Sequence, residues 1–217
     1  MGVAMPAAEI LVLLSFGVIG SGLKFIDEAF DENAFNKKIA FLIAAILVVI
    51  WIGISIYDAS AATVLFAILA GVFLSGKVDN PAFRTSAFAL AILLFLSGRF
   101  SLIWLPFFLL TLAGIIDEKG NNYVDAKKTN KIVTFFFLHR FSMKLGVLAL
   151  CLTDCLAWLY LFAFLTFDIA YDLVGVIAKK ANIKTTVLFC RNVPPLPQER
   201  ISFIRNFELD GIVIADD

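Results

Sequence analysis

The sequence predicts an all-α polytopic membrane protein, a bundle of about seven transmembrane helices with six as the alternative, followed by a small cytosolic tail of α/β character. The 217 residues are 61% hydrophobic and only 17% charged, whereas a soluble domain is about 45–50% apolar and about a quarter charged. The chain also contains long uncharged stretches that approach the roughly 17–25 residues a helix needs to cross the hydrocarbon layer. These stretches are residues 10–23, 39–57, 59–76, 85–98 and 100–116.

The first five expected crossings are given an orientation by the basic residues in the loops between them. These crossings span residues 8–24, 39–57, 60–76, 85–98 and 100–116. Lysine and arginine are concentrated in the loops after the first, third and fifth crossings, and the loops between these contain few of them. Because cytoplasmic loops are enriched in basic residues, we expect the N-terminus outside and the basic loops in the cytosol.

The stretch from residue 131 to residue 180 has two interpretations. A turn near Thr153 and Asp154 would divide it into two crossings, give seven in total and return the chain to the cytosol, leaving Arg99 as the only external one of 18 basic residues. One continuous helix would give six crossings and bring Asp154 near the middle of the membrane. An ionisable group at that depth is typical of a proton or ion relay.

The domain organisation expected is a transmembrane bundle over residues 1–180 and a cytosolic tail over residues 181–217. Within the tail, TTVLFC is predicted as a strand, PLPQERISFIRNF as a helix and LDGIVIADD as a turn with a second strand. Such a tail is too small to bury its own core, so we expect it to pack on the cytosolic loops or to bind a protein partner. The net charge of zero gives no indication of nucleic-acid binding.

Acidic residues recur where the expected crossings reach the cytosolic face, in FIDEAFDE, KVDN, IIDEKGNNYVD and FDIAYD. Asp27 and Asp31, like Asp168 and Asp172, are four residues apart, which on a helix places both carboxylates on one face with their Cβ atoms about 5–6 Å apart. Like charges at that distance repel, and a divalent cation would relieve the repulsion. Since Mg²⁺ prefers carboxylate and water ligands, these four aspartates are the predicted metal ligands.

Basic residues accompany the acidic groups at the same face. The predicted substrate-binding residues are Lys77, Arg84, Lys119, Arg140 and Lys184. Together with a carboxylate-bound Mg²⁺ they would suit the binding of a diphosphate at the membrane surface. The alternative is that the acidic groups are solvated helix ends paired with neighbouring lysines. No single residue is predicted to be catalytic.

Part of the sequence resembles UbiA-type intramembrane prenyltransferases. The segment DIAYDLVGVIAKKANIKTT resembles the second aspartate-rich motif of that family, in which aspartates precede a Gly-x-Lys-Thr-like stretch. Asp168, Asp172, Lys184 and Thr185 match the motif, and Asn182 stands where glycine is usual.

IDEAFDE resembles the first motif of the family through Asp27 and Asp31, with Ile26 in place of the usual asparagine. Family members generally have more helices and a longer chain, and the third aspartate of the second motif is absent here. The resemblance implies Mg²⁺ bridging the aspartates to a prenyl diphosphate whose allylic chain lies within the helix bundle.

Three functions follow from these patterns. The first is a Mg²⁺-dependent transferase that uses a prenyl or other lipid diphosphate. The second is a non-catalytic membrane scaffold that recruits a partner through its C-terminal tail. The third is a small transporter, for which Asp154 would be the central residue.

Overall fold

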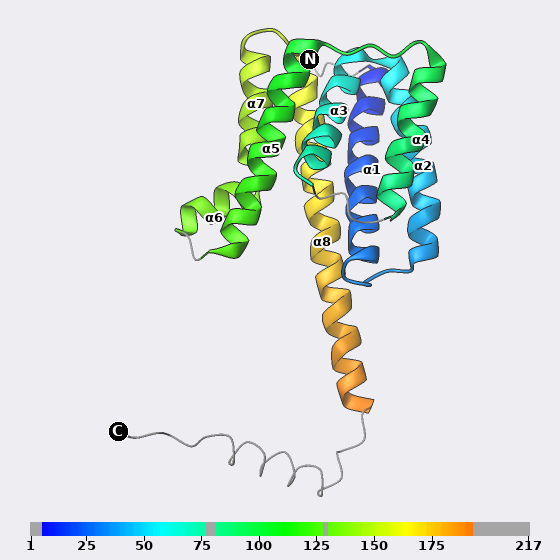
Figure 1. Ribbon diagram of the computed structural model, residues 1–217, viewed down its shortest axis with the longest axis vertical. Coiled ribbons are helices and arrows are strands. Elements are labelled where there is room, and N and C mark those ends of the chain that lie inside the picture. Colours follow the sequence, from blue (N-terminus) through cyan, green and yellow to red (C-terminus); the bar gives the residue numbers. More distant parts are fainter. Residues whose placement is uncertain (1–5, 77–80, 128–129, 193–217) are drawn as a thin grey trace, which may run out of the picture. The chain divides into compact units, whose positions relative to one another are not determined.

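Every regular element among the described residues is an α-helix (Figure 1). The computed structural model describes residues 6–76, 81–127 and 130–192, without the side chains of residues 125 and 181–192. The chain divides into two compact units, Met1–Lys179 and Lys180–Asp217, and the candidate site lies in the first. The helices are α1 (Ala7–Phe30), α2 (Lys37–Tyr57), α3 (Ala59–Leu74), α4 (Pro81–Ser97), α5 (Trp104–Ala126), α6 (Lys131–Leu138), α7 (Phe141–Leu152) and α8 (Trp158–Asn192).

The lengths of the helices support a membrane protein and do not establish seven crossings. Three segments are long and apolar enough to cross a membrane: Ala7–Phe30, Lys37–Tyr57 and Trp158–Lys180. A fourth arises if α6 and α7, bent by 63° at their junction, form one broken span. Helices α3 and α4 have 16 and 17 residues, or about 25 Å at 1.5 Å per residue, against a hydrocarbon layer of about 30 Å.

The turn expected near Thr153 and Asp154 is present. Helix α7 ends at Leu152 and α8 begins at Trp158. Asp154 lies between them with a φ of 55° and an exposed side chain, in the turn that joins the two helices at the same end of the bundle as the start of α1 (Figure 1). The single continuous helix over residues 131–180 is therefore wrong, and Asp154 does not lie in the middle of a helix.

The first strand expected in the C-terminal tail is wrong. Residues 185–190, the segment TTVLFC, continue α8, which runs to Asn192. A short apolar run with β-branched residues fits a strand or a helix equally well, and here the preceding helix extends through it. The predicted tail helix and second strand, in residues 193–217, lie outside the described residues.

Two close helix crossings depend on glycine. Gly20 of α1 packs directly on the backbone of Phe167 in α8, so that a Cβ atom at residue 20 would overlap the Phe167 carbonyl group. Gly71 of α3 faces Gly114 of α5, where a Cβ atom would lie 3.2 Å from the Gly114 Cα atom. Small residues allow such close packing of helices in membranes. The first crossing fixes α1 against α8, the two helices that contain the predicted metal ligands.

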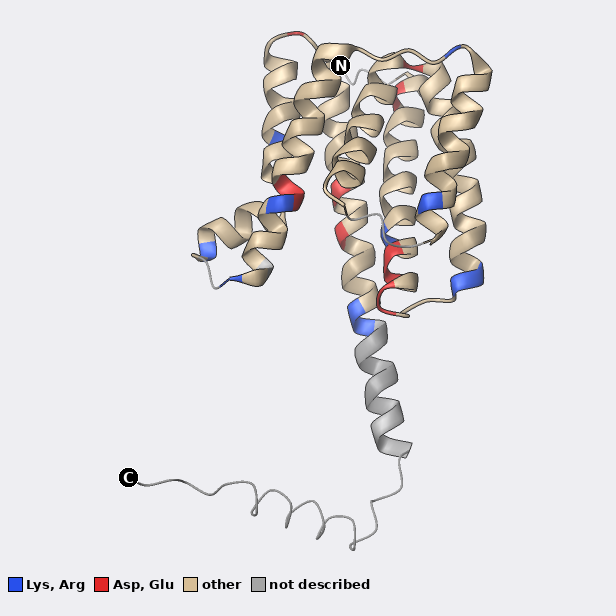
Figure 2. Ribbon diagram, in the orientation of Figure 1, with Lys and Arg blue, Asp and Glu red and all other residues tan. Residues whose placement is uncertain are grey.

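Charged residues in the first unit are concentrated toward the ends of the bundle (Figure 2). One end, here called the charged end, is formed by the C-terminal ends of α1, α3 and α5 and the N-terminal ends of α2, α4 and α7, while α8 passes through it (Figure 1). Between the ends, apolar side chains such as Phe16, Leu65, Leu110 and Phe164 form a fully buried core.

Candidate functional site

A cavity of about 720 Å³ opens at the charged end, between segments that are far apart in the sequence. We call it the charged cavity. Its charged lining residues are Asp27, Glu28, Asp31, Asp117, Glu118 and Asp172, with Lys24, Arg140 and Lys179. Its apolar lining includes Leu23, Trp51, Ile68, Leu69, Val72, Phe83 and Phe167. The cavity therefore offers a polar surface and an apolar surface to one ligand.

The α1 side of the cavity is organised around Lys24. Its Nζ atom lies 2.9 Å from Asp27 Oδ2 and 3.0 Å from Glu28 Oε1. The three residues share one face of α1 because residues three and four apart are neighbours on a helix. Gly175 of α8 leaves room for the lysine, since a Cβ atom there would lie 3.2 Å from Lys24 Cε. Glu28 is buried, so the lysine neutralises a carboxylate that has little access to water.

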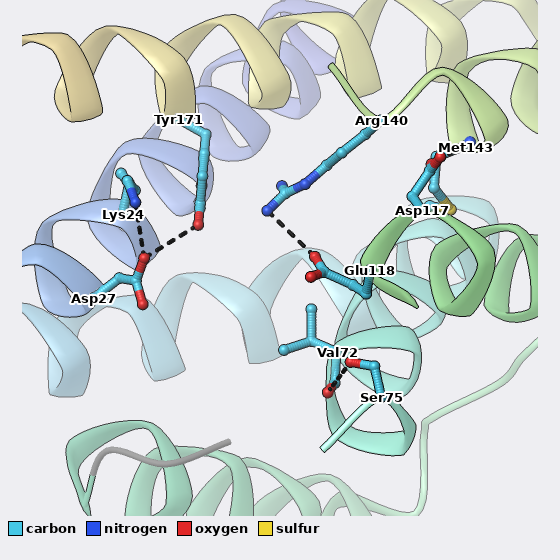
Figure 3. A network of polar contacts seen from close by, with 9 residues as sticks. All are labelled: Lys24, Asp27, Val72, Ser75, Asp117, Glu118, Arg140, Met143 and Tyr171. Carbon is cyan, nitrogen blue, oxygen red and sulfur yellow. Dashed lines mark hydrogen bonds and ion pairs between the residues drawn. The ribbon is translucent and has the colours of Figure 1, made fainter. Parts of the chain in front are cut away.

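Tyr171 of α8 lies between two basic side chains (Figure 3). Lys24 Nζ is 5.2 Å from the centre of its ring, and Arg140 Cζ is 4.3 Å from it. Both distances are within the range of a cation–π attraction. The Tyr171 hydroxyl donates a hydrogen bond of 3.4 Å to Asp27 Oδ2, which joins α8 to the acidic cluster of α1.

Arg140 owes its position to the break between α6 and α7. It adopts a left-handed conformation, with a φ of 50°, and precedes the first residue of α7. Asp117 of α5 accepts hydrogen bonds from the backbone N–H groups of Ser142 and Met143, at 3.0 and 2.8 Å, and so satisfies the exposed donors at the start of α7.

The guanidinium group of Arg140 points from this break toward Glu118 (Figure 3). Its Nη2 atom lies 3.5 Å from Glu118 Oε1. Asp117 and Glu118 are adjacent, so the first fixes the start of α7 and the second attracts the arginine just before it. The arginine thereby becomes part of the cavity wall, opposite Lys24 and Asp27.

Lys144 fastens α7 to α8 beside the cavity. Its Nζ atom lies 2.6 Å from Asp168 Oδ2 and donates a 2.7 Å hydrogen bond to the backbone oxygen of His139. Asp168 is buried and is not among the residues that line the cavity. This ion pair holds the α6–α7 break against α8, and Arg140 follows directly after the carbonyl group that Lys144 binds.

Three of the four predicted metal ligands line the charged cavity: Asp27, Asp31 and Asp172. The fourth, Asp168, is paired with Lys144 instead. Asp172 Oδ2 lies 3.8 Å from His139 Nδ1. Among the residues that the structure describes, no three His, Cys, Asp or Glu side chains are grouped so that they could hold a metal ion by themselves.

This arrangement fits one way of binding Mg²⁺ and not another. It does not fit a closed cage of protein ligands, because the carboxylates are not gathered at one point. Mg²⁺ usually retains several waters and is held by one or two carboxylates together with phosphate oxygens of the substrate. Carboxylates that face a common cavity from α1 and α8 fit that shared mode of binding.

The predicted basic residues are only partly associated with the cavity. Arg140 lines it, whereas Arg84 and Lys119 are exposed and do not. Lys77 lies outside the described residues, and Lys184 belongs to α8 at a residue whose side chain is not described.

Lys24, Tyr171 and Glu118 also line the cavity. None of them was predicted as a metal ligand or a substrate-binding residue, although Lys24 and Glu118 are among the charged groups that the sequence places at the cytosolic face. The spacing of Lys24 to Asp27 and Glu28, three and four residues, signals ion pairs on one helix face. The sequence contains no comparable signal for Tyr171, whose role depends on how closely α1 approaches α8.

Comparison of the chain with protein-family models, with curated proteins and with solved structures gives no match. The function is therefore argued from the charged cavity itself.

Proposed function

We propose that this protein is a membrane-embedded, Mg²⁺-dependent transferase that uses a prenyl or other lipid diphosphate. The observation that carries the proposal is the convergence of Asp27 from α1, Asp31 directly after α1 and Asp172 from α8 on one cavity that also contains Arg140. These residues come from opposite ends of the bundle sequence, and helix packing brings them together.

The charge of the cavity supports a requirement for metal. Six carboxylates line it against three basic side chains, which gives a net charge of about −3 when His139 is neutral. A diphosphate anion alone would be repelled by this lining, and a divalent cation would be attracted to it. When bound, Mg²⁺ would stabilise negative charge on the diphosphate, while Arg140 and Lys179 would bind its remaining oxygens.

The apolar lining supports a lipid as the rest of the ligand. Trp51, Ile68 and Leu69 line the same cavity as the charged groups. A second crevice of about 30 Å³, lined by apolar residues and Ser86, adjoins the cavity and shares Leu23, Trp51, Leu69 and Phe83 with it. An amphipathic ligand with a charged head and a hydrocarbon chain matches both surfaces.

In the proposed reaction, the bond between the lipid carbon and the diphosphate oxygen breaks, and the diphosphate leaves with the bonding electrons. A nucleophilic acceptor such as a hydroxyl group forms the new bond to that carbon and gives its proton to solvent. The contribution of this chain is to bind and neutralise the leaving group at the charged end and to keep the hydrocarbon chain away from water.

The same proposal includes a topology. Helices α1–α5, α7 and α8 would be the seven crossings, with the charged end in the cytosol. Exposed Lys37 and Lys38 at the start of α2, and Lys179 in the cavity lining, support this orientation, because basic residues favour the cytosolic side.

The test is calorimetric titration of the full chain in detergent, first with Mn²⁺ as a probe for Mg²⁺ and then with its complex with inorganic pyrophosphate. We expect the unaltered protein to bind both, and Asp27→Asn/Asp172→Asn to bind them about 100-fold more weakly. Glu32→Gln is the matched control, since Glu32 is an exposed carboxylate next to Asp31 that does not line the cavity. A folded protein that binds neither probe would refute the proposal.

A positive result leads directly to the reaction. Pyrophosphate release from a prenyl diphosphate in the presence of Mg²⁺ would then be measured for the same three proteins. Binding without release from any of a panel of chain lengths would contradict the transferase assignment and leave a binding protein.

A further inference from the structure

Lys24 is paired with two carboxylates, and one of them, Asp27, is a proposed ligand of the metal ion. Its side chain is 21% exposed, and its amino group is bound to Asp27 and Glu28, both of which line the charged cavity. The amino group also lies over the ring of Tyr171. Lys24 therefore reaches the cavity wall with its charge already neutralised by the protein.

Asp27 is the point at which metal binding and this neutralisation compete. The amino group of Lys24 and the hydroxyl group of Tyr171 both donate to the same oxygen, Asp27 Oδ2, at 2.9 and 3.4 Å. A divalent cation bound by Asp27 would withdraw electron density from that oxygen and repel the ammonium group. Lys24 would then keep Glu28 as its protein partner and gain a free donor directed at the cavity.

Arg140 repeats the arrangement across the cavity. It is paired with Glu118 at 3.5 Å, a longer contact than either ion pair of Lys24, and its Cζ atom lies 4.3 Å from the centre of the Tyr171 ring. The basic groups that could bind a phosphate are thus held by carboxylates that line the same cavity. A cation that binds at Asp27, or an anion that binds at Lys24 or Arg140, therefore meets a group that is already engaged in an ion pair.

We propose that Lys24 is the residue that couples the two halves of the ligand, because it exchanges Asp27 for a phosphate oxygen when a cation binds Asp27. The cation alone must displace the ammonium group, and the anion alone must break the Lys24–Asp27 ion pair. When the cation and the anion bind together, the cation takes the place of Lys24 at Asp27, and the phosphate oxygen takes the place of Asp27 at Lys24. By thermodynamic linkage each then strengthens the binding of the other to the same extent. This inference rests on the proposed function, since it assumes that cation and diphosphate share the cavity.

The coupling makes an unusual prediction for Lys24→Gln, namely two effects of opposite sign. Mn²⁺ alone should bind about tenfold more tightly than to the unaltered protein, because the competing charge is removed. The Mn²⁺–pyrophosphate complex, titrated at excess Mn²⁺, should bind about tenfold more weakly, because a phosphate ligand is lost. Lys24→Arg retains the charge and should restore binding of the complex.

Each outcome of these titrations decides between the two proposals. If Lys24→Gln weakens both probes, or changes neither, the coupling is refuted while binding to the unaltered protein still supports the proposed function. If the unaltered protein binds neither probe, the proposed function fails first and the coupling fails with it. A lysine that did not compete with the cation at Asp27 and did not bind a phosphate oxygen would not produce these two opposite effects together.

A measurement on the unaltered protein keeps the inference testable if Lys24→Gln does not fold. An amine-reactive reagent would be applied to the full chain, and the modification of Lys24 followed by mass spectrometry. We expect Mn²⁺ alone to increase the rate at Lys24, and Mn²⁺ with pyrophosphate to reduce it below the rate in the free protein. Equal rates under all three conditions would overturn the inference. The exposed Lys37 and Lys38, which do not line the cavity, serve as internal references.

Discussion

The two ends of the bundle each contain an aspartate hydrogen-bonded to a tyrosine of α8, and the two pairs differ in almost every other respect. At the charged end, Tyr171 donates to Asp27 at 3.4 Å. At the opposite end, Tyr160 donates to Asp58 at 2.6 Å. The tyrosines are 11 residues apart, about three turns of α8. One helix therefore contributes a tyrosine to each end of the bundle.

The pair at the opposite end is fully committed to structure. Asp58 Oδ1 accepts a hydrogen bond of 2.8 Å from the backbone N–H of Ala61 and thereby caps α3, while Oδ2 accepts from the buried Tyr160. Each oxygen has its own donor. Neither residue lines the charged cavity. This pair connects the α2–α3 turn to α8, and both oxygens of Asp58 are hydrogen-bonded within the protein.

At the charged end, two donors share one oxygen of the aspartate, and we call this a contested pair. The donors come from different helices, a cavity lies beside Asp27 Oδ2, and two cations lie near the ring of the tyrosine. The residue types alone therefore do not distinguish a structural pair from a ligand site. What distinguishes them is whether the acceptor atoms are already satisfied and whether a cavity gives a ligand access to them.

We expect the largest change in stability at Asp168. The sequence predicts this residue as a metal ligand, but its ion pair with Lys144 makes it a structural residue. Asp168→Asn leaves Lys144 without its counter-ion in a mostly buried position, and we expect unfolding in detergent to become easier by about 3 kcal/mol. The affinity for Mn²⁺ of the folded fraction should change by less than about twofold.

Two further measurements sharpen this assignment. Lys144→Met/Asp168→Leu removes both charges and should recover most of the lost stability, because replacing a buried pair by apolar residues is often neutral. A loss of Mn²⁺ binding in Asp168→Asn as large as in Asp27→Asn/Asp172→Asn would show that Asp168 is a ligand after all.

The next prediction concerns Arg140 and Arg84, which the sequence predicts equally as substrate-binding residues. Arg140→Gln removes a cavity-lining charge and should weaken binding of the Mn²⁺–pyrophosphate complex about 30-fold, which corresponds to about 2 kcal/mol for a charged hydrogen bond. Arg84→Gln is the matched control, because Arg84 is exposed on α4 and does not line the cavity. Equal losses in the two variants, measured by calorimetry, would contradict the boundary of the site.

The helices of the bundle could be predicted from the sequence, because a helix that crosses the hydrocarbon layer needs a long run of uncharged residues. Each uncharged stretch up to residue 116 corresponds to a helix, and the turn at Thr153 and Asp154 is confirmed. Segment 185–190 was mispredicted because a run of six residues, four of them apolar, contains too little periodicity to separate strand from helix.

The candidate site was predicted in part, and the misses have physical causes. Spacing of four residues placed Asp168 and Asp172 on one face of α8, and that inference holds for any helix. Spacing could not show that α7 brings Lys144 against the first aspartate while the second lines the cavity. The α6–α7 break was equally hidden, because Arg140 adopts its left-handed conformation in a stretch, LHRFS, without glycine or proline.

The smallest expected effect is a direct exchange between the two Asp–Tyr pairs. Tyr160→Phe removes a donor from Asp58 and should reduce the stability of the protein by about 1 kcal/mol, the usual contribution of a buried hydrogen bond, with Mn²⁺–pyrophosphate binding unchanged. Tyr171→Phe should cost less stability, because its bond is long and shares its acceptor with Lys24, yet it should alter binding of the complex. Thermal unfolding gives the stability of each variant, and calorimetry gives its affinity for the Mn²⁺–pyrophosphate complex. If the two substitutions affected stability and binding in the same proportion, the distinction between a satisfied pair and a contested pair would have no functional meaning in this protein.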